Sequence, residues 1–489
     1  MKRTKIVASI SDLNCSEDFI RSLFESGMNV VRINSAHQSF DGALKIVKSV
    51  RSVSSRIALM MDTKGPEIRT GAFAEPFVVQ AGEMVEMSGN CRPDTSTSTS
   101  TSTYTSTSTS TSISVCIPVT HSAFARDVPL GSTVLIDDGE IELLAIEVDG
   151  DSLLCRVIHG GLIKGRKGVN IPNVHIGLPS LSSRDLKYID FAVENDFDFI
   201  AHSFVRSRDD VEAVQEVLDK LESSIKVIAK IENHNGVQNI DEILEIAYGV
   251  MVARGDLAIE IPFEKVPGIQ KMLINKCIER RKPVIIATQM LHSMIENPRP
   301  TRAEVNDVAG AIYDQADAIM LSGETAVGAF PVEAVKTMAA IAGEVEKNKE
   351  DINDIPIVVI NNDISAFLIK SAVEGAVELN AEAVIADTTS GRTIRSLSAY
   401  RGKCPILAQC YSQETVRHLA LSYGVSARFM EPEHITHEFI GKALGLLKED
   451  NLLQLTDMVV IVGGNFGRSK GVSFVEIGSV ENLISAEKK

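Results

Sequence analysis

Short apolar runs alternate with longer amphipathic segments through most of residues 1–345. Eight of these runs are rich in β-branched residues and are too continuously apolar for a sheet with one exposed face, which is typical of parallel strands buried on both sides. The eight runs occupy residues 4–10, 28–34, 57–64, 197–205, 226–233, 249–257, 283–290 and 318–325. The segments between them carry apolar positions at helical spacing. Eight strand–helix units predict an α/β fold, a (β/α)₈ TIM barrel with its functional residues at the carboxyl ends of the strands.

The strand spacing breaks once, between the third and fourth runs. Residues 67–169 contain alternating runs but no long helical pattern, which indicates a small β-barrel domain inserted into a barrel loop. A further α/β pattern follows a polar hinge near residues 347–356, with strands expected at 382–388, 404–410, 425–430, 458–464 and 471–478. We therefore predict four segments: barrel (1–66), inserted β lid (67–169), barrel (170–347) and C-terminal α/β domain (348–489).

One tract is unlike the rest of the chain. From Thr95 to Ser112, threonine and serine alternate with Tyr104 as the one interruption. Neither face of such a strand is apolar, so the pairing register is unspecified and a disordered or solvated loop is favoured. A modified or recognition tract, or an error in the sequence, are the alternatives.

Bulk composition narrows the function classes. The net charge of −16 argues against a protein that coats nucleic acid, but small anionic substrates remain allowed if local cations attract them. No apolar run approaches about 18 residues, so we expect no membrane span, and the amino terminus resembles that of a cytoplasmic protein. The seven cysteines form no CxxC pair, which favours reduced thiols over zinc or a disulfide framework.

The ends of the predicted strands carry the candidate chemistry. Lys230 and Glu232 close the fifth run, and alternation makes them point the same way, towards one mouth of the barrel. Asp256 closes the sixth run, which would place it beside Glu232 on the adjacent strand. Two carboxylates beside a lysine suit Mg²⁺ or Mn²⁺. A salt-bridged barrel mouth without a metal is the alternative.

Other polar residues gather at the same rim. They are Arg32 and Asn34 at the end of the second run and His37 after it, Asp62 and Thr63 at the end of the third run and Glu67 and Arg69 after it, and Thr288 in the seventh. Each alone is more often structural than catalytic. Together they supply the cations, carboxylates and hydroxyl that phosphoryl transfer needs, because that reaction depends on positioning and charge neutralisation.

These residues lie in segments that resemble pyruvate kinases. The stretch VIAKIENHNGV (227–237) resembles the segment around the family's catalytic lysine. Further similar blocks follow in the same order along nearly the whole chain: MNVVRIN, MDTKGPEIRTG, LIDDGEIEL, KGVNIP, VARGDL, IIATQML, NPRPTRAEVNDVA and IMLSGETA. The resemblance implies a phosphotransferase of glycolysis that passes the phosphoryl group of phosphoenolpyruvate to ADP, giving pyruvate and ATP.

The resemblance also implies roles for individual residues. Glu232 and Asp256 would hold the divalent metal, Lys230 would stabilise the transferring phosphoryl group and the enolate, Arg32 would bind phosphate, and Thr288 would help to deliver the proton. The remaining implied contacts are Ser203, Gly255 and Asp256 with the substrate; Asn34, His37, Arg69 and Lys167 with the nucleotide; and Asn34, Asp62 and Thr63 with K⁺.

Three positions depart from the family pattern. Ala36 replaces a serine that would ligate K⁺, and Ser35 lies one place early, whereas Glu67 is the residue expected in K⁺-dependent members. On balance these residues favour K⁺ dependence. Ala258 stands where glycine is usual. The Ser/Thr tract replaces ordinary lid sequence, where it would affect lid closure.

The C-terminal segment contains a possible regulatory loop, formed by Thr388, Thr389, Ser390, Gly391, Arg392 and Thr393 between a strand and a helix. It resembles the loop where regulated pyruvate kinases bind a sugar-phosphate effector; a nucleotide effector or an ordinary capped helix start are alternatives. The resemblance further implies a homotetramer.

Two other functions fit parts of the same pattern. The first is a metal-dependent barrel lyase acting on oxaloacetate-like acids. Such an enzyme would need no nucleotide lid, yet Arg69 and Lys167 are present. The second is a catalytically silent homologue that senses an effector or acts as a scaffold. That function predicts loss of Lys230, a metal carboxylate or Thr288, and none is lost.

Overall fold

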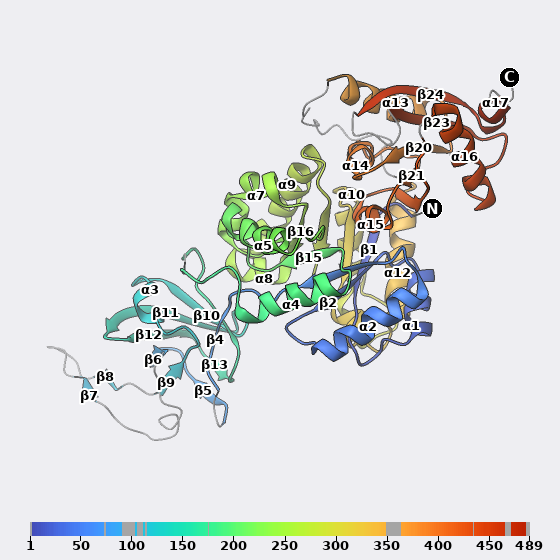
Figure 1. Ribbon diagram of the computed structural model, residues 1–489. Coiled ribbons are helices and arrows are strands. Elements are labelled where there is room, and N and C mark those ends of the chain that lie inside the picture. The colour runs from blue at the N-terminus through green and yellow to red at the C-terminus, as the bar shows by residue number, and fades with distance from the viewer. Residues whose placement is uncertain are drawn as a thin grey trace.

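The computed structural model describes residues 2–72, 75–89, 103–104, 111–112, 115–174, 176–348, 363–433, 435–464 and 471–485. The molecule consists of three units along its length: a β-rich lid, a central barrel and a C-terminal α/β unit at the opposite end from the lid (Figure 1). The amino terminus lies beside the C-terminal unit.

Eight parallel strands close the central barrel in the order β1-β19-β18-β17-β16-β15-β3-β2. They are β1 (Lys5–Ser9), β2 (Val30–Asn34), β3 (Ala58–Asp62), β15 (Phe199–His202), β16 (Lys226–Ile231), β17 (Gly249–Ala253), β18 (Val284–Ala287) and β19 (Ala318–Leu321). Each lies within one of the eight predicted runs, so the predicted barrel is confirmed. These strands are apolar on both faces because one face fills the barrel interior and the other packs against helices.

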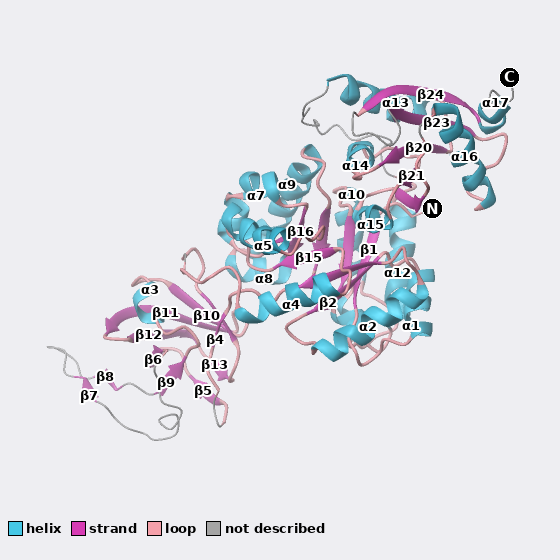
Figure 2. Ribbon diagram, viewed as in Figure 1, coloured by secondary structure: helices cyan, strands magenta, loops and turns pink. Residues whose placement is uncertain are grey.

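Helices surround the barrel on its outside (Figure 2). They are α1 (Glu17–Glu25), α2 (Phe40–Val53), α4 (Ser183–Glu194), α5 (Arg208–Lys220), α6 (His234–Gln238), α7 (Ile240–Ile246), α8 (Arg254–Glu260), α9 (Val266–Glu279), α10 (Arg302–Tyr313), α11 (Gly323–Ala326) and α12 (Pro331–Val345). Four of the strands, β15, β17, β18 and β19, end three or four residues before the predicted runs do. The sixth and eighth strands end early because residues from Arg254 and Gly323 onward already turn into the short helices α8 and α11. Asp256 therefore lies in the first turn of α8 and not on a strand.

The lid contains a seven-stranded sheet in the order β4-β14-β10-β11-β12-β6-β9. Its strands are β4 (Ile68–Arg69), β6 (Met84–Ser88), β9 (Val115–Pro118), β10 (Thr133–Ile136), β11 (Ile141–Asp149), β12 (Ser152–His159) and β14 (Gly168–Asn170). An isolated bridge between Thr70 and Val119 brings the two edges of this sheet together. The lid also contains the pair β5 (Phe77–Val79) and β13 (Gly161–Ile163), and the short helix α3 (Phe124–Asp127). It has its own apolar core.

Most of the Ser/Thr tract lies outside the described residues. Within it, β7 (Thr103–Tyr104) and β8 (Thr111–Ser112) pair antiparallel. Cys116, just after the tract, is disulfide-bonded. The expectation of reduced thiols is therefore wrong at this position, whereas Cys15, Cys155, Cys277, Cys404 and Cys410 form no disulfide.

The C-terminal unit is built on a five-stranded sheet with the order β22-β21-β20-β23-β24. Its strands are β20 (Ala383–Thr388), β21 (Ile406–Cys410), β22 (Val425–Phe429), β23 (Met458–Gly464) and β24 (Val472–Ser479), and its helices are α13 (Asp363–Glu378), α14 (Arg392–Ala399), α15 (Gln413–His418), α16 (Thr436–Glu449) and α17 (Val480–Ser485). All five predicted strands are present. No helix in the described part of the chain is long and apolar enough to cross a membrane.

The C-terminal unit closes the amino-terminal end of the barrel. Leu421 is fully buried and belongs to the same apolar cluster as the residues that fill the barrel interior. Buried ion pairs join the two units: Arg401 lies 2.6 Å from Asp317, and Arg417 lies 2.6 Å from Asp198. Because this end is sealed, the carboxyl ends of the strands are left to carry the site.

Candidate active site

A buried lysine lies at the centre of the polar rim. The Lys230 ammonium, near the end of β16, lies 3.0 Å from both Asp62 Oδ1 and Glu232 Oε1, and it donates to Ser203 Oγ at 2.6 Å. Burial alone would lower the pKa of Lys230, but the two carboxylates raise it above its ordinary value. The lysine therefore stays protonated. The predicted alternation on β16 is confirmed here, since Lys230 and Glu232 meet on one side of the strand.

Arg32 joins the same network from the end of β2. Its Nε donates to Asp62 Oδ2 at 2.6 Å and its Nη1 donates to Ser9 Oγ at 2.9 Å. Burial works to raise the pKa of Asp62, but Arg32 and Lys230 outweigh it and hold that pKa below its usual range. Asp62 is thus a buried anion that holds two cations in place, one on either side.

Glu232 and Asp256 form the second part of the site. Glu232 is 1% exposed, and its Oε2 accepts the backbone N–H of Phe204 at 2.6 Å. Burial raises the pKa of Glu232 to about 7, with Lys230 acting against the rise and Asp256 adding to it. Burial likewise raises the pKa of Asp256. Two adjacent desolvated carboxylates repel each other, which a bound cation would relieve.

No group of three or more His, Cys, Asp or Glu side chains in the described ranges is arranged to hold a metal by itself. A metal at Glu232 and Asp256 would therefore take its other ligands from water and substrate. Mg²⁺ commonly binds in this way, through one or two carboxylates plus phosphate oxygens. The two carboxylates fit such an ion.

Thr288 directly follows β18, the strand that pairs with β17, and Asp256 lies in the helix that follows β17. Its Oγ1 accepts the backbone N–H of Gly255 at 2.8 Å and donates to the Ala287 carbonyl at 2.6 Å. Thr288 has a φ of +68° and Gln289 a φ of +55°. A β-branched residue with positive φ is rare, and such strain gathers at functional sites.

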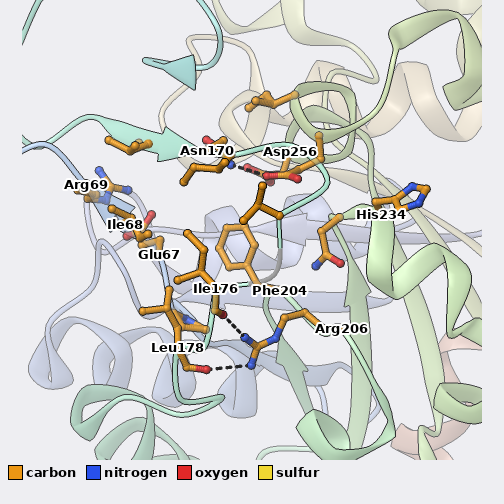
Figure 3. Close-up of a pocket in the computed structure, with 18 of the residues that line it drawn as sticks. Glu67, Ile68, Arg69, Asn170, Ile176, Leu178, Phe204, Arg206, His234 and Asp256 are labelled. Carbon is orange, nitrogen blue, oxygen red and sulfur yellow. Dashed lines mark hydrogen bonds and ion pairs between the residues drawn. The ribbon is translucent and has the colours of Figure 1, made fainter. Parts of the chain in front are cut away.

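The lid and the barrel enclose a pocket beside these residues (Figure 3). Arg69, Lys167 and Asn170 line it from the lid, and Asp256 and Phe204 line it from the barrel. Asn170 Nδ2 donates to Glu260 Oε1 at 3.1 Å, which ties the lid to helix α8. The pocket thus brings two predicted nucleotide contacts, Arg69 and Lys167, to the same opening as a predicted metal ligand.

The two lid cations already have carboxylate partners. Arg69 Nε lies 2.7 Å from Glu67 Oε1, and Lys167 Nζ lies 2.7 Å from Asp137 Oδ1. The sequence analysis did not identify Asp137 as a partner of Lys167, although Asp137 lies in the LIDDGEIEL block. The two residues are brought close by the pairing of β10 with β14, which the sequence does not reveal.

Arg206 fixes the hinge through which the chain returns from the lid. It donates to the carbonyls of Ile176 and Leu178 at 3.1 and 3.0 Å, and Figure 3 shows both bonds. Asp210 accepts from its Nε and Nη2. Burial acts to raise the pKa of Asp210, but hydrogen bonds from Arg206 and Ser180 dominate and lower it to about 2.

The other two predicted nucleotide contacts are not in this pocket. His37 is exposed and lines a separate hollow with Arg184 and Lys187. Asn34 Oδ1 accepts the backbone N–H of Ala36 at 3.0 Å.

The predicted K⁺ ligands Asn34, Asp62 and Thr63 lie at the ends of β2 and β3, which are adjacent strands. The hydroxyl of Ser35 is buried there and has no hydrogen-bond partner among the described residues.

The predicted effector loop joins β20 to α14, as expected. Thr388 is buried and its Oγ1 accepts the N–H of Gly391 at 2.9 Å. Gly391 has a φ of +76°, a conformation that glycine adopts without strain. Thr389, Ser390 and Arg392 are exposed. The loop lies on the C-terminal unit, at the opposite end of the molecule from the lid (Figure 1).

Comparison with known proteins gives a consistent result. The family models described as "Pyruvate kinase, barrel domain" and "Pyruvate kinase, alpha/beta domain" match residues 1–335 and 367–477. The chain is 42% identical to a pyruvate kinase of Borreliella burgdorferi over 488 residues, covering 99% of this chain and 98% of the relative. It is 38% identical to a pyruvate kinase of Bacillus licheniformis over 500 residues, covering 99% and 82%.

Solved structures agree. The crystal structure of a pyruvate kinase from Cryptosporidium parvum superposes with a TM-score of 0.87 at 34% identity, covering 98% of this chain and 96% of that one. Family models that match both the barrel and the C-terminal unit, relatives that match almost end to end, and a matching solved fold all lead to one conclusion. This chain belongs to the pyruvate kinase family.

Proposed function

We propose that the chain passes the phosphoryl group of phosphoenolpyruvate to ADP at the carboxyl end of the barrel, giving pyruvate and ATP. The observation that carries this proposal is the buried Lys230 ammonium, which lies 3.0 Å from the carboxylates of Asp62, at the end of β3, and Glu232, just after β16. A protonated amine held rigidly in a water-poor site can stabilise negative charge that develops on a transferring group.

The family requires a divalent metal, and we propose that Glu232 and Asp256 hold Mg²⁺ or Mn²⁺. The raised pKa values of both carboxylates support this assignment, since each is destabilised as an anion without a cation. When bound, the metal supplies positive charge to the substrate's carboxylate and phosphoryl oxygens.

The protein groups around that position have separate tasks. Arg32, oriented by Asp62, would bind the phosphoryl group. Lys230 would donate to the transferring phosphoryl group and then to the enolate oxygen left behind. Ser203 Oγ, which accepts from Lys230, and the backbone of Gly255 and Asp256 would orient the substrate.

Thr288 would deliver a proton to the methylene carbon of enolpyruvate. Its hydroxyl lies against the Gly255 backbone, so it is positioned beside the element that carries Asp256. Protonation completes the reaction, because it converts the enol form into pyruvate.

We propose that ADP binds between barrel and lid, with Arg69 and Lys167 on its phosphates and Asn34 and His37 on the barrel side. Glu67 and Asp137 now neutralise the two lid cations, so nucleotide phosphates would have to replace these partners. His37 lies outside the pocket that Arg69 and Lys167 line, which implies that the lid moves when nucleotide binds. Closure would exclude water and so favour transfer over hydrolysis.

A monovalent cation is the next part of the proposal. Asn34, Asp62 and Thr63 would ligate K⁺, and Glu67 supports dependence on it. The buried Ser35 hydroxyl, adjacent in sequence to Asn34, is an oxygen that an ion in this region could engage. Ala36 cannot contribute a side-chain oxygen.

Regulation and assembly are proposed from the family alone. Thr388 to Thr393 would bind the phosphate of a sugar-phosphate or nucleotide effector, in a homotetramer located in the cytoplasm. We also propose the four segment boundaries given above. Nucleic acid and membrane are not expected as partners.

The deciding experiment measures pyruvate formation from phosphoenolpyruvate and ADP with Mg²⁺, with and without K⁺. Turnover that needs K⁺ would support both the function and the cation site. Turnover without K⁺ would keep the function and remove the cation. If folded protein shows no turnover in either condition, with sugar-phosphate and nucleotide effectors also tested, the chain is a silent homologue.

A further inference from the structure

The two residues after β18 need external support to keep their backbone conformation. Thr288 and Gln289 have φ values of +68° and +55°, which side-chain-bearing residues seldom adopt in succession. Thr288 is partly buried and Gln289 is exposed, so packing does little to hold the second of them. Hydrogen bonds must therefore fix this turn.

Arg254 provides those hydrogen bonds. Its Nη2 donates to the Thr288 carbonyl at 2.8 Å, and its Nε donates to the Ala287 carbonyl at 3.3 Å. Arg254 is the first residue of α8, directly after β17, and its side chain is 13% exposed. One guanidinium therefore spans two consecutive carbonyls of the neighbouring strand end.

Asp307, on helix α10, holds that guanidinium from behind. Its Oδ1 lies 2.6 Å from Arg254 Nη1, and its Oδ2 lies 2.8 Å from Arg254 Nη2. Gln270 Oε1 lies 3.5 Å from the same Nη1. A bidentate arginine–carboxylate pair fixes the orientation of the fork as well as its position.

The residue after Arg254 holds the other end of Thr288. The Gly255 N–H donates to Thr288 Oγ1 at 2.8 Å. Consecutive residues thus bind the carbonyl and the hydroxyl of one threonine. A shift of Arg254 would move both contacts. Asp256, which we assign to the metal, directly follows Gly255.

We propose that Arg254, held by Asp307, is a positioning residue that fixes the Thr288 hydroxyl for the protonation of enolpyruvate. This inference rests on the role proposed above for Thr288. In that step the π electrons of the enolate C2–C3 bond form a C–H bond at C3, the C2–O bond becomes a carbonyl, and the proton comes from solvent through the Thr288 hydroxyl. Arg254 itself touches neither substrate nor proton.

The test separates protonation from phosphoryl transfer. Solvent exchange at the pyruvate methyl group reports the reverse of the protonation step, and loss of its ¹H NMR signal in D₂O with Mg²⁺ and ATP measures it. ATP formation from phosphoenolpyruvate and ADP reports phosphoryl transfer, because enolpyruvate that leaves unprotonated still leaves ATP behind.

We expect Arg254→Met to lower the exchange rate about tenfold to a hundredfold, since small misplacements at a reacting centre are costly. ATP formation should fall by about twofold or less, since a group acting on one step affects that step alone. Arg254→Lys should recover part of the exchange, because lysine keeps the charge but cannot span both carbonyls and Asp307. Asp307→Asn keeps the shape of the partner, and it should lower exchange in the same direction if Arg254→Met fails to fold.

Controls distinguish the possible failures. Arg208→Met, which removes an exposed arginine paired with Glu212, should leave both rates unchanged. If Arg254→Met and Asp307→Asn lower ATP formation as much as exchange, the contact is merely structural and the inference is overturned. If both leave exchange unchanged while Thr288→Val lowers it, the inference fails and the role of Thr288 stands. If Thr288→Val leaves exchange unchanged, the role of Thr288 is wrong and the inference falls with it.

Discussion

Replacing Lys230 by methionine tests the centre of the proposed site. The change keeps most of the side chain's volume but removes an ammonium that is buried and lies 3.0 Å from Asp62 and from Glu232. At that distance each pair is worth about 5 kcal/mol before desolvation, at the effective dielectric of about 20 that suits proteins. Most of this is offset by the cost of burial, and breaking one buried pair typically costs about 3–5 kcal/mol of stability.

Two measurable losses follow. The barrel should unfold at a temperature about 6–20 °C lower, taking about 2–4 °C per kcal/mol for a unit of its size. Turnover at saturating substrates should fall by about 10²–10³, since removing one preorganised donor from a site of this kind costs about that much in kcat. Thermal unfolding by circular dichroism and coupled measurement of pyruvate give the two values.

A matched variant makes the outcome interpretable. Lys220→Met removes an exposed lysine that lies 3.8 Å from Glu216, so it should change stability by less than about 1 kcal/mol and leave turnover intact. If Lys230→Met is folded at the assay temperature and keeps turnover within about tenfold of the parent, a barrier change of under about 1.4 kcal/mol, Lys230 is not the catalytic cation. A large loss of turnover with an unchanged unfolding temperature would instead show that the buried ion pairs of Lys230 do not stabilise the barrel as argued here.

Three further predictions concern single sites. Glu232→Gln should raise the Mg²⁺ concentration for half-maximal turnover about tenfold or more, since a charged contact is worth about 1.5–3 kcal/mol; an unchanged requirement would exclude Glu232 as a ligand. Arg401→Met should cost about 3–5 kcal/mol because Arg401 is 2% exposed and its loss leaves the buried Asp317 carboxylate without its arginine, whereas Arg208→Met should leave the unfolding temperature nearly unchanged; equal unfolding temperatures of the two variants would contradict this. The folded pKa of Asp210, about 2, lies below its unfolded value of about 3.9, so its contribution to stability is present above about pH 4 and is lost as pH falls towards 2. Asp210→Asn should therefore melt lower than the parent at pH 7 and converge with it near pH 2, and a constant difference would be contrary to this reasoning.

The apolar pattern predicted the strands well because each barrel strand is buried on both faces. It overestimated the length of several strands. At β17 the reason is that residues such as Leu257 are apolar and are buried in a helix as readily as in a strand. The hydrophobic pattern alone does not distinguish the two over so few residues.

The relative placement of site side chains was predictable where the alternation along one strand fixes it, as for Lys230 and Glu232. It was not predictable where partners meet across the sequence. Asp307 reaches Arg254 from a helix that begins 48 positions later, at Arg302, and no local spacing reports that contact. The positive φ of Thr288 likewise depends on distant support, because threonine carries no intrinsic preference for that conformation.

The placement of the lid between β3 and β15 has a consequence for biosynthesis. These strands are hydrogen-bonded neighbours, yet the ribosome makes all of the lid between them. The nascent chain therefore presents the edge of β3 without its partner while the lid emerges, and β1 waits still longer for β19. Exposed strand edges invite pairing with other chains. We expect the early nascent chain to be a substrate for chaperones until β15 emerges, with the lid able to form its own core in the meantime.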